Sequence, residues 1–441
     1  MSNEAYSYDE AQPDLEDQAE PVQFEHADDL SQSANAARPV PRISIQAFCD
    51  DPATAEAIQY AAEDRRLSKT HVSVHMGGAT AAVAHYQESP TPNLIVIESL
   101  MDRDAMLHEL DQLAECCDAG TKVVVIGHVN DVVLYRELLR RGVSEYVVAP
   151  VQPIAFMEAV SNLYNDPTSD PVGHVIAFVG AKGGVGSSTI CHNVAWTISC
   201  ALKSNVVVAD MDLAFGTTGL DFNQDPVQGI AEALSAPERL DDQLLDRLLT
   251  KCTDNLSIFA APVVLDRDYD MSADACEMVI DVVRQNVPYV VVDIPHGWTS
   301  WSKRLLLQAD EVVVTATPDL ANLRNAKNVF DLLRQSRSND GPPHLVLNMV
   351  NMPKRPEISV HEFCQGLDAK AAATVEFDSE TFGTAANNGQ MIEELNGKAK
   401  AVPALHDLAM TLTHRNEGKV AKTGASKSAL APLLEKFNLM R

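Results

Sequence analysis

A glycine-rich segment at residues 181–189, with the sequence AKGGVGSST, constrains the fold of this chain more than any other feature. In phosphate-binding loops of the form GxxxxGK[ST], backbone N–H groups and a helix N-terminus face the phosphates, a lysine reaches the outer ones, and a hydroxyl holds magnesium. Here Ser187 occupies the position of that lysine, and Ala181 occupies the position of the first glycine. The segment therefore has the form of a phosphate-binding loop that lacks the lysine at its usual position.

Three glycines and an early lysine preserve the chemistry of such a loop. Gly183, Gly184 and Gly186 let the backbone turn tightly and approach an anion closely. Lys182 still supplies a positive charge. A lone glycine-rich stretch is usually only a turn, so the flanking segments decide between the two interpretations.

Both flanks of the loop have the expected pattern. Residues 174–180 form a short apolar run suited to a strand that is buried on both faces. After the loop, apolar residues recur at the spacing of one helical face, which predicts an amphipathic helix opening at the hydroxyls of Ser188 and Thr189. The members of that face are Ile190, Val194, Ile198 and Ala201. Strand, loop and helix together favour nucleotide binding over a structural turn.

Acidic residues end two further apolar strands. Residues 205–212 run into Asp210 and Asp212, and residues 288–295 contain Asp293. The carboxyl ends of parallel strands converge on the ligand crevice, so these acids can meet phosphates and a magnesium ion there. Asp210 and Asp293 could instead merely cap the turns that follow them.

Residues 172–415 resemble the ParA/MinD family of dimeric ATPases. Lys182-Gly183-Gly184-Val185-Gly186, Asp210-Met211-Asp212 and Asp293-Ile294-Pro295 look like that family's deviant Walker A, switch I and Walker B motifs. The resemblance implies ATP and Mg²⁺ as cofactors and a sandwich homodimer, in which Lys182 reaches the partner's ATP and Asp212 orients the attacking water. The implied nucleotide contacts are Lys182, Gly183, Gly184, Val185, Gly186, Ser187, Ser188, Thr189, Asp210, Asp293 and Asn348, with Ser188 and Asp293 on magnesium. Asn348 is assigned as the adenine contact that the resemblance implies, although Asn351 is also near the right place in the sequence.

Residues 41–166 read as alternating strands and helices and look like a response-regulator receiver, a flavodoxin-like fold. Strands are expected at 43–51, 94–98, 122–127 and 146–150. Receiver phosphorylation needs an aspartate, a hydroxyl and a lysine at three strand ends, where this chain has Glu98, Gly127 and Ala149. We therefore expect a pseudo-receiver that is not phosphorylated and that acts in interaction or localisation. The predicted fold class is α/β, with two doubly wound domains.

A degenerate receiver joined to such an ATPase resembles the CpaE/TadZ family of cytoplasmic proteins. The resemblance implies a role in placing and assembling the tight-adherence (Flp) pilus secretion machinery, often at a cell pole, with machinery proteins as partners. Weak ATP hydrolysis is expected, because the usual lysine is missing. Two other functions stay open: a partition or positioning ATPase of the ParA or MinD type, and a scaffold that binds nucleotide with negligible hydrolysis.

Composition agrees with a cytoplasmic protein that does not bind nucleic acid. The net charge is −28, whereas non-specific DNA binding depends on clustered lysine and arginine. Residues 1–40 carry ten acids and one arginine, which predicts a disordered acidic tail. The eight cysteines show no metal-ligand spacing, and neither a signal peptide nor a long apolar run is present.

The C-terminal residues 416–441 are expected to form a polar linker and a short amphipathic helix. Leu433, Phe437 and Met440 can share one face of that helix. MinD proteins end in a membrane-targeting helix, but this segment is short and only weakly basic, and stable anchoring usually takes two signals. We favour docking onto a partner or onto the chain's own domain, with membrane contact indirect or weak.

Overall fold

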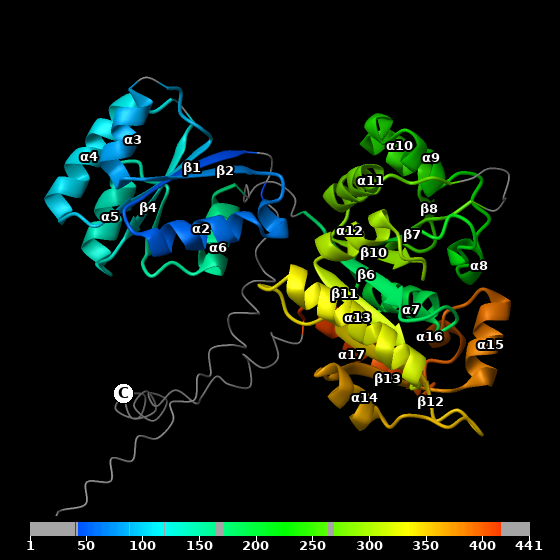
Figure 1. Cartoon of the computed structure of the whole chain (residues 1–441). Helices are drawn as coiled ribbons and strands as arrows, with labels where there is room; N and C mark the ends of the chain where they lie inside the picture. Colours follow the sequence, from blue (N-terminus) through cyan, green and yellow to red (C-terminus); the bar gives the residue numbers. More distant parts are fainter. Residues whose placement is uncertain are drawn as a thin grey trace, which may run out of the picture.

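The computed structural model describes residue 40 and residues 43–87, 89–118, 120–164, 172–262 and 269–415. Two sheets are visible as separate bodies in Figure 1, one parallel throughout and the other parallel except for one edge strand. The predicted α/β class with two doubly wound sheets is confirmed. The acidic tail up to residue 39 and the C-terminal segment from residue 416 lie outside the described residues, so the structure does not test those two predictions.

The first sheet has the strand order β2-β1-β3-β4-β5, and every pairing in it is parallel. This is the flavodoxin-like order, in which ligands bind where the order reverses. The elements are β1 (Ser44–Cys49), α2 (Pro52–Ala62), η1 (Arg65–Leu67), β2 (His71–Met76), α3 (Gly78–Tyr86), β3 (Leu94–Ser99), α4 (Arg103–Cys116), β4 (Lys122–Gly127), α5 (Val132–Arg140), β5 (Glu145–Val148) and α6 (Pro153–Tyr164).

In the first sheet, β2 is the strand that the sequence did not predict. Its residues, HVSVHM, carry two histidines and a serine among only three apolar residues. It lies at the edge of the sheet, and none of its residues is fully buried. An edge strand needs no continuous apolar run, so a hydrophobicity pattern does not reveal it.

The second sheet has eight strands in the order β13-β12-β11-β6-β10-β7-β9-β8, with only β8 antiparallel. Its elements are β6 (His174–Gly180), α7 (Ser187–Cys200), β7 (Val206–Asp210), α8 (Thr218–Asp221), α9 (Ile230–Ser235), η2 (Pro237–Arg239), α10 (Asp242–Leu248), β8 (Thr250–Lys251), β9 (Leu256–Phe259), α11 (Ala273–Asn286), β10 (Tyr289–Ile294), α12 (Ser300–Gln308), β11 (Glu311–Ala316), α13 (Leu320–Ser336), β12 (His344–Val350), α14 (Val360–Leu367), β13 (Ala371–Glu376), α15 (Ser379–Asn388), α16 (Ile392–Leu395) and α17 (Ala401–Leu412).

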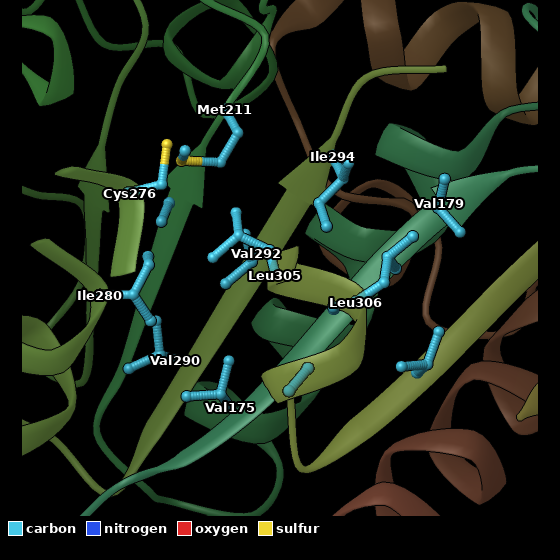
Figure 2. Close-up of a cluster of buried hydrophobic side chains, with 14 of the residues drawn as sticks. Val175, Val179, Met211, Cys276, Ile280, Val290, Val292, Ile294, Leu305 and Leu306 are labelled. Carbon is cyan, nitrogen blue, oxygen red and sulfur yellow. The ribbon is translucent and has the colours of Figure 1, made fainter. Parts of the chain in front are cut away.

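Central strand β6 is buried on both faces because its side chains alternate between two apolar cores. Val175 and Val179 point into one core, which Figure 2 shows together with Val292 of β10 and Leu305 of α12. Ile176, from the same strand, packs in the opposite core with residues of α7 and α17. The continuous apolar run at 174–180 reflects this double burial.

The two sheets are joined by buried ion pairs. Arg65, from η1 of the first sheet's domain, contacts Asp310 at 2.9 Å and Asp340 at 3.0 Å, and its side chain is only 8% exposed. Arg66 also pairs with Asp340, and Asn339 donates to Asp64 at 3.1 Å. Asp310 directly precedes β11, so these contacts attach the first domain to the amino ends of the strands in the second sheet.

Candidate nucleotide site

The glycine-rich loop joins β6 to α7 and has a left-handed backbone at two positions. Gly184 and Gly186 have φ angles of 79° and 83°, which L-residues with a side chain rarely adopt. Gly186 is the N-cap of α7, and no side chain caps this helix. The predicted helix follows the loop, but it begins at Ser187 with Gly186 as its N-cap, so its predicted opening at the Ser188 and Thr189 hydroxyls is wrong.

Backbone and amide contacts fix the shape of the loop. The Ala181 N–H donates to the Thr315 carbonyl at 2.8 Å, and the Asn325 amide donates to the Ala181 carbonyl at 2.9 Å. Asn348, at the end of the neighbouring β12, donates to the Val185 carbonyl at 2.8 Å. The loop is thus held by contacts from β11, α13 and β12.

Asn348 is therefore a clamp on the loop in this structure. Its side-chain oxygen accepts from the Met349 N–H at 2.9 Å, so both ends of the amide are engaged, and the side chain is buried. Asn351 is exposed, and its backbone has a positive φ of 62°. Asn348, rather than Asn351, borders the cavity next to the loop.

A cavity of about 160 Å³ adjoins the loop on the α7 side. Gly186, Thr189 and Asn348 border it where it meets the loop, and Phe377 and Phe382 contribute aromatic surface. An apolar hollow beside a glycine-rich loop of this kind has the character of a site for an aromatic base. The two phenylalanines were missed in the sequence analysis, because they lie almost 200 residues from the loop.

Asp293, at the carboxyl end of β10, has the properties of a cation ligand. Its side chain is buried, and Oδ1 has no hydrogen-bond partner among the described residues. Burial, together with the nearby Asp210 and Asp212 carboxylates, raises the pKa of Asp293 to about 6, against the opposing effects of His192 and of the Ser188 hydroxyl. A buried carboxylate oxygen without a donor, next to a hydroxyl, fits the ligand preference of Mg²⁺.

Asp210 holds the segment that follows it. One carboxylate oxygen accepts from the Asp212 N–H at 3.1 Å, and the other accepts from the Thr218 N–H at 3.2 Å and the Thr218 hydroxyl at 2.7 Å. The side chain is buried, and burial raises its pKa. Of the two roles that the sequence left open for Asp210, these contacts are those of the capping role.

A buried histidine beneath the loop was missed in the sequence analysis. His192 of α7 contacts Asp221 at 2.7 Å and the Thr218 hydroxyl at 3.0 Å, and lies 3.7 Å from Asp293. It follows Thr189 by three residues, so helical spacing alone places it on the side of α7 that faces the site. This histidine connects the segment after β7 to the Asp293 carboxylate.

Lys182 and Asp212, the two predicted catalytic residues, differ in how they are held. Lys182 is exposed. Asp212 is partly buried and accepts a hydrogen bond from the Phe215 N–H at 3.0 Å. Both lie on loops at the carboxyl ends of β6 and β7, the end of the sheet where Asp293 also lies. Ser187, which replaces the usual lysine, has a buried hydroxyl without a partner among the described residues.

The corresponding edge of the first sheet is closed by Glu98. One oxygen of this buried carboxylate accepts from the N–H groups of Asp50 and Asp51 at 2.9 and 2.8 Å. The other oxygen contacts the Thr54 hydroxyl at 2.6 Å and His128 at 3.0 Å. The carboxylate therefore has both oxygens engaged at the third strand's end, where the resemblance to a receiver would place a phosphate acceptor.

Gly127 has a structural reason to lack a side chain. A Cβ atom at this position would lie 2.2 Å from the Tyr146 hydroxyl oxygen. That hydroxyl donates to the Val129 carbonyl at 2.7 Å, so Tyr146 is fixed across the position. A glycine stands at the end of β4 because Tyr146 of β5 occupies the space that a side chain would need.

Comparisons with known proteins show that the chain is similar to two groups of proteins. A pilus assembly protein CpaE from Caulobacter crescentus CB15 is 52% identical in sequence; the match covers 29% of this chain and 98% of that one, with a TM-score of 0.29. Identity at this level over nearly the whole of the other chain decides the relationship. The chain belongs to the CpaE family of pilus assembly proteins.

The CpaE-family chain is also similar to MinD and ParA family proteins. The septum site-determining protein MinD of Bacillus subtilis is 24% identical over 275 residues, which is 57% of this chain and 97% of that protein. A ParA family ATPase from Chlorobium tepidum is 22% identical, covers 54% of this chain and 98% of its own, and has a TM-score of 0.50. No protein-family model matches the chain. The CpaE-family chain thus contains a ParA/MinD-like ATPase fold. Among the described residues, none of the helices has the length and apolar character that a membrane span requires.

Proposed function

We propose that this chain is an ATP-binding, weakly hydrolysing dimeric switch that localises and helps to assemble a tight-adherence pilus machinery. The observation that carries the proposal is the buried Oδ1 of Asp293, which has no hydrogen-bond partner among the described residues. The Asp293 carboxylate is hydrogen-bonded to Ser188, which follows the glycines of the loop. The relationship to CpaE pilus assembly proteins supplies the process.

Each part of the site has an assigned task. The backbone of residues 183–186 would bind the phosphates, Ser188 and Asp293 would hold Mg²⁺, and the cavity with Phe377 and Phe382 would hold the base. Bound Mg-ATP supplies a terminal phosphoryl group that can be transferred to water. Asp212 would orient that water, and the exposed Lys182 is free to reach a second subunit.

The serine at position 187 accounts for the expected slow turnover. A lysine about 4 Å from a phosphate oxygen contributes up to roughly 4 kcal/mol at an effective dielectric constant near 20. Loss of that much stabilisation from the transition state alone slows a reaction by about a thousandfold. Turnover in this chain would therefore depend on Lys182 of a second subunit.

The first domain would act as a docking module. In this domain the Glu98 carboxylate is already hydrogen-bonded to the Asp50 and Asp51 N–H groups. The buried Arg65–Asp310 pair attaches the domain to the second sheet. A partner protein that binds to a domain fixed in this way would be held next to the nucleotide-binding half of the chain. The net charge of −28 opposes the alternative of a DNA-partition ATPase.

The test is the molar mass of the purified chain by light scattering, with and without Mg-ATP. We expect ATP to shift the chain from monomer to dimer, and Asp212→Ala to keep the dimer by blocking hydrolysis. A dimer with no measurable turnover would support the nucleotide-binding scaffold instead. A monomer at every ATP concentration would contradict the switch, and retention on DNA at low salt would support the partition alternative.

A further inference from the structure

A cluster of histidines surrounds Glu311 at the end of the second sheet opposite to the nucleotide site. Glu311 begins β11, His174 begins β6 and His344 begins β12, whereas the phosphate-binding loop follows the other end of β6. His414 completes the cluster from the residues after α17. None of these residues has a role in the proposed nucleotide chemistry.

The donor atoms of three of these residues converge. One ring nitrogen of His174, one of His414 and a carboxylate oxygen of Glu311 all lie within 4.8 Å of one another. His414 Nε2 lies 3.1 Å from Glu311 Oε1. Two imidazoles and one carboxylate form the donor set that, with one open position, occurs in three-ligand zinc sites.

The relative placement of the two imidazoles suits a shared ion. Their ring centroids lie 5.4 Å apart with an interplanar angle of 84°. Two imidazole rings bound tetrahedrally to one Zn²⁺ at the usual metal–nitrogen distance have centroids about 5 Å apart. The rings therefore already stand at nearly the spacing that joint coordination requires.

His174 provides an observation that points directly to a ligand. Its Nε2 atom is buried and has no hydrogen-bond partner among the described residues. Its other ring nitrogen, Nδ1, lies 3.9 Å from the Asp310 carboxylate. A metal-binding imidazole has this arrangement, with one nitrogen toward a carboxylate and the other left for the ion.

Glu311 is supported from the opposite side. His344 Nε2 lies 2.8 Å from Glu311 Oε2, and the Glu311 side chain is only 7% exposed. One carboxylate oxygen thus faces His344 and the other faces His414. Ligating carboxylates are usually oriented by such an outer hydrogen bond, so His344 has the position of a supporting residue.

An open hollow leads to the cluster. It has a volume of about 880 Å³, and Glu311, His344 and Thr411 lie on its wall. An ion could therefore reach the carboxylate without unfolding of the sheet. From the donor set, the ring geometry and this access, we propose that His174, Glu311 and His414 form a binding site for a divalent transition-metal ion of the Zn²⁺ class.

The experiment measures metal binding by the purified full-length chain after chelator treatment and in the absence of nucleotide. We expect one equivalent of Zn²⁺ to bind in calorimetry, and one equivalent of Co²⁺ to give the intense visible absorption of a four-coordinate site. Failure of the wild-type chain to bind either ion would overturn the proposal, and this result needs no variant.

Variants assign the ion to the cluster. We expect His174→Gln and His414→Gln each to lower the Zn²⁺ affinity at least a hundredfold, and His344→Gln to lower it about 10- to 100-fold, as the loss of an outer partner does. His406→Gln is the matched control, because His406 pairs with Glu393 at 3.0 Å outside the cluster. Circular dichroism and nucleotide binding check that each variant is folded. Unchanged Zn²⁺ affinity in folded His174→Gln and His414→Gln would contradict the assignment.

Discussion

The Asn348 side-chain amide donates to the Val185 carbonyl at 2.8 Å and so ties β12 to the glycine-rich loop. The contact is close enough to restrict the loop sequence. A Cβ atom at Gly186 would lie 2.5 Å from Asn348 Nδ2. The glycine and the asparagine are therefore parts of one packing arrangement.

The three loop glycines should differ in what an added methyl group costs. Gly183→Ala meets no close atom and has no left-handed φ, so we expect almost no loss of stability. Gly184→Ala has free space but a φ of 79°, which costs about 1–2 kcal/mol. Gly186→Ala has both the strained φ and the contact with Asn348, so it should be the most destabilising.

Urea unfolding of the three variants without nucleotide measures this order. Gly183→Ala serves as the internal control, because it adds the same methyl group to the same loop. Equal stability of the three variants would show that the backbone of the free loop differs from the one described here.

Asp293→Asn should separate protein stability from metal binding. Since the pKa of Asp293 is raised to about 6 from 3.8, the folded state binds more protons than the unfolded state between these values, and the ionised side chain destabilises the fold above pH 6. The amide variant should therefore unfold at a higher temperature than the wild type at pH 7.5 without nucleotide, and this gain should vanish near pH 4.

The same variant should lose affinity for Mg-ATP, because Mg²⁺ binds the ionised carboxylate. Wild-type affinity for Mg-ATP should rise as the pH increases from 5 to 7, whereas that of the variant should not. Thermal scans and fluorescent-nucleotide titrations over this pH range measure both effects. A wild-type affinity that is independent of pH would argue against Asp293 as a magnesium ligand.

The parts of the site that are local in sequence could be predicted from the sequence. The loop at 181–189 and the acids at strand ends lie in short segments whose apolar flanks indicate their structure, and parallel topology then brings them to one edge. The role of Asn348 as a clamp could not be predicted, because it depends on the distance between β12 and the loop at 181–189. His192 had a usable signal, its helical spacing from Thr189.

Other features depend on contacts between distant segments. The aromatic wall from Phe377 and Phe382, and the Arg65–Asp310 pair between the two sheets, each join parts of the chain that no periodicity relates. Strand β2 was missed because its edge position requires little hydrophobicity. Long-range packing and the polar edge strand β2 are thus among the features that the sequence pattern alone did not provide.

The first domain should resist modification by small phosphodonors. Both oxygens of Glu98 are engaged, and Gly127 cannot carry a hydroxyl side chain beside Tyr146. Incubation of the full chain with acetyl phosphate and Mg²⁺, followed by intact-mass spectrometry, should show no added phosphoryl group. A phosphorylated product mapped to Asp50, Asp51 or Glu98 would overturn the pseudo-receiver interpretation.

Arg65→Ala should release the first domain from the second. Burial alone would raise the pKa of Asp310, but Arg284, His174 and Arg65 lower it far below its usual range, so the carboxylate is charged and depends on its cations. Removal of one partner of a buried pair costs about 3–5 kcal/mol. Small-angle scattering should therefore show a more extended molecule, and calorimetry should show two separate unfolding transitions.

The matched control for that experiment is Arg304→Ala. Arg304 pairs with Asp274 at 2.8 Å within the second domain, and its side chain is 46% exposed. Exposed pairs contribute only about 0–1 kcal/mol, so neither the molecular dimensions nor the number of transitions should change. Equal behaviour of the two variants would show that the Arg65 contacts do not hold the domains together.

Hydrolysis should depend on a second subunit, because Ser187 leaves the loop without its usual lysine. If Lys182 acts across a dimer, the turnover per chain should rise with protein concentration, and Lys182→Ala should reduce it by up to about a thousandfold. Mixing Lys182→Ala chains with Asp212→Ala chains tests this further. In the mixed dimer one site has an intact Asp212 and receives the intact Lys182 of the other subunit, so activity should be partly restored. Fast turnover that is independent of concentration and survives Lys182→Ala would refute the mechanism.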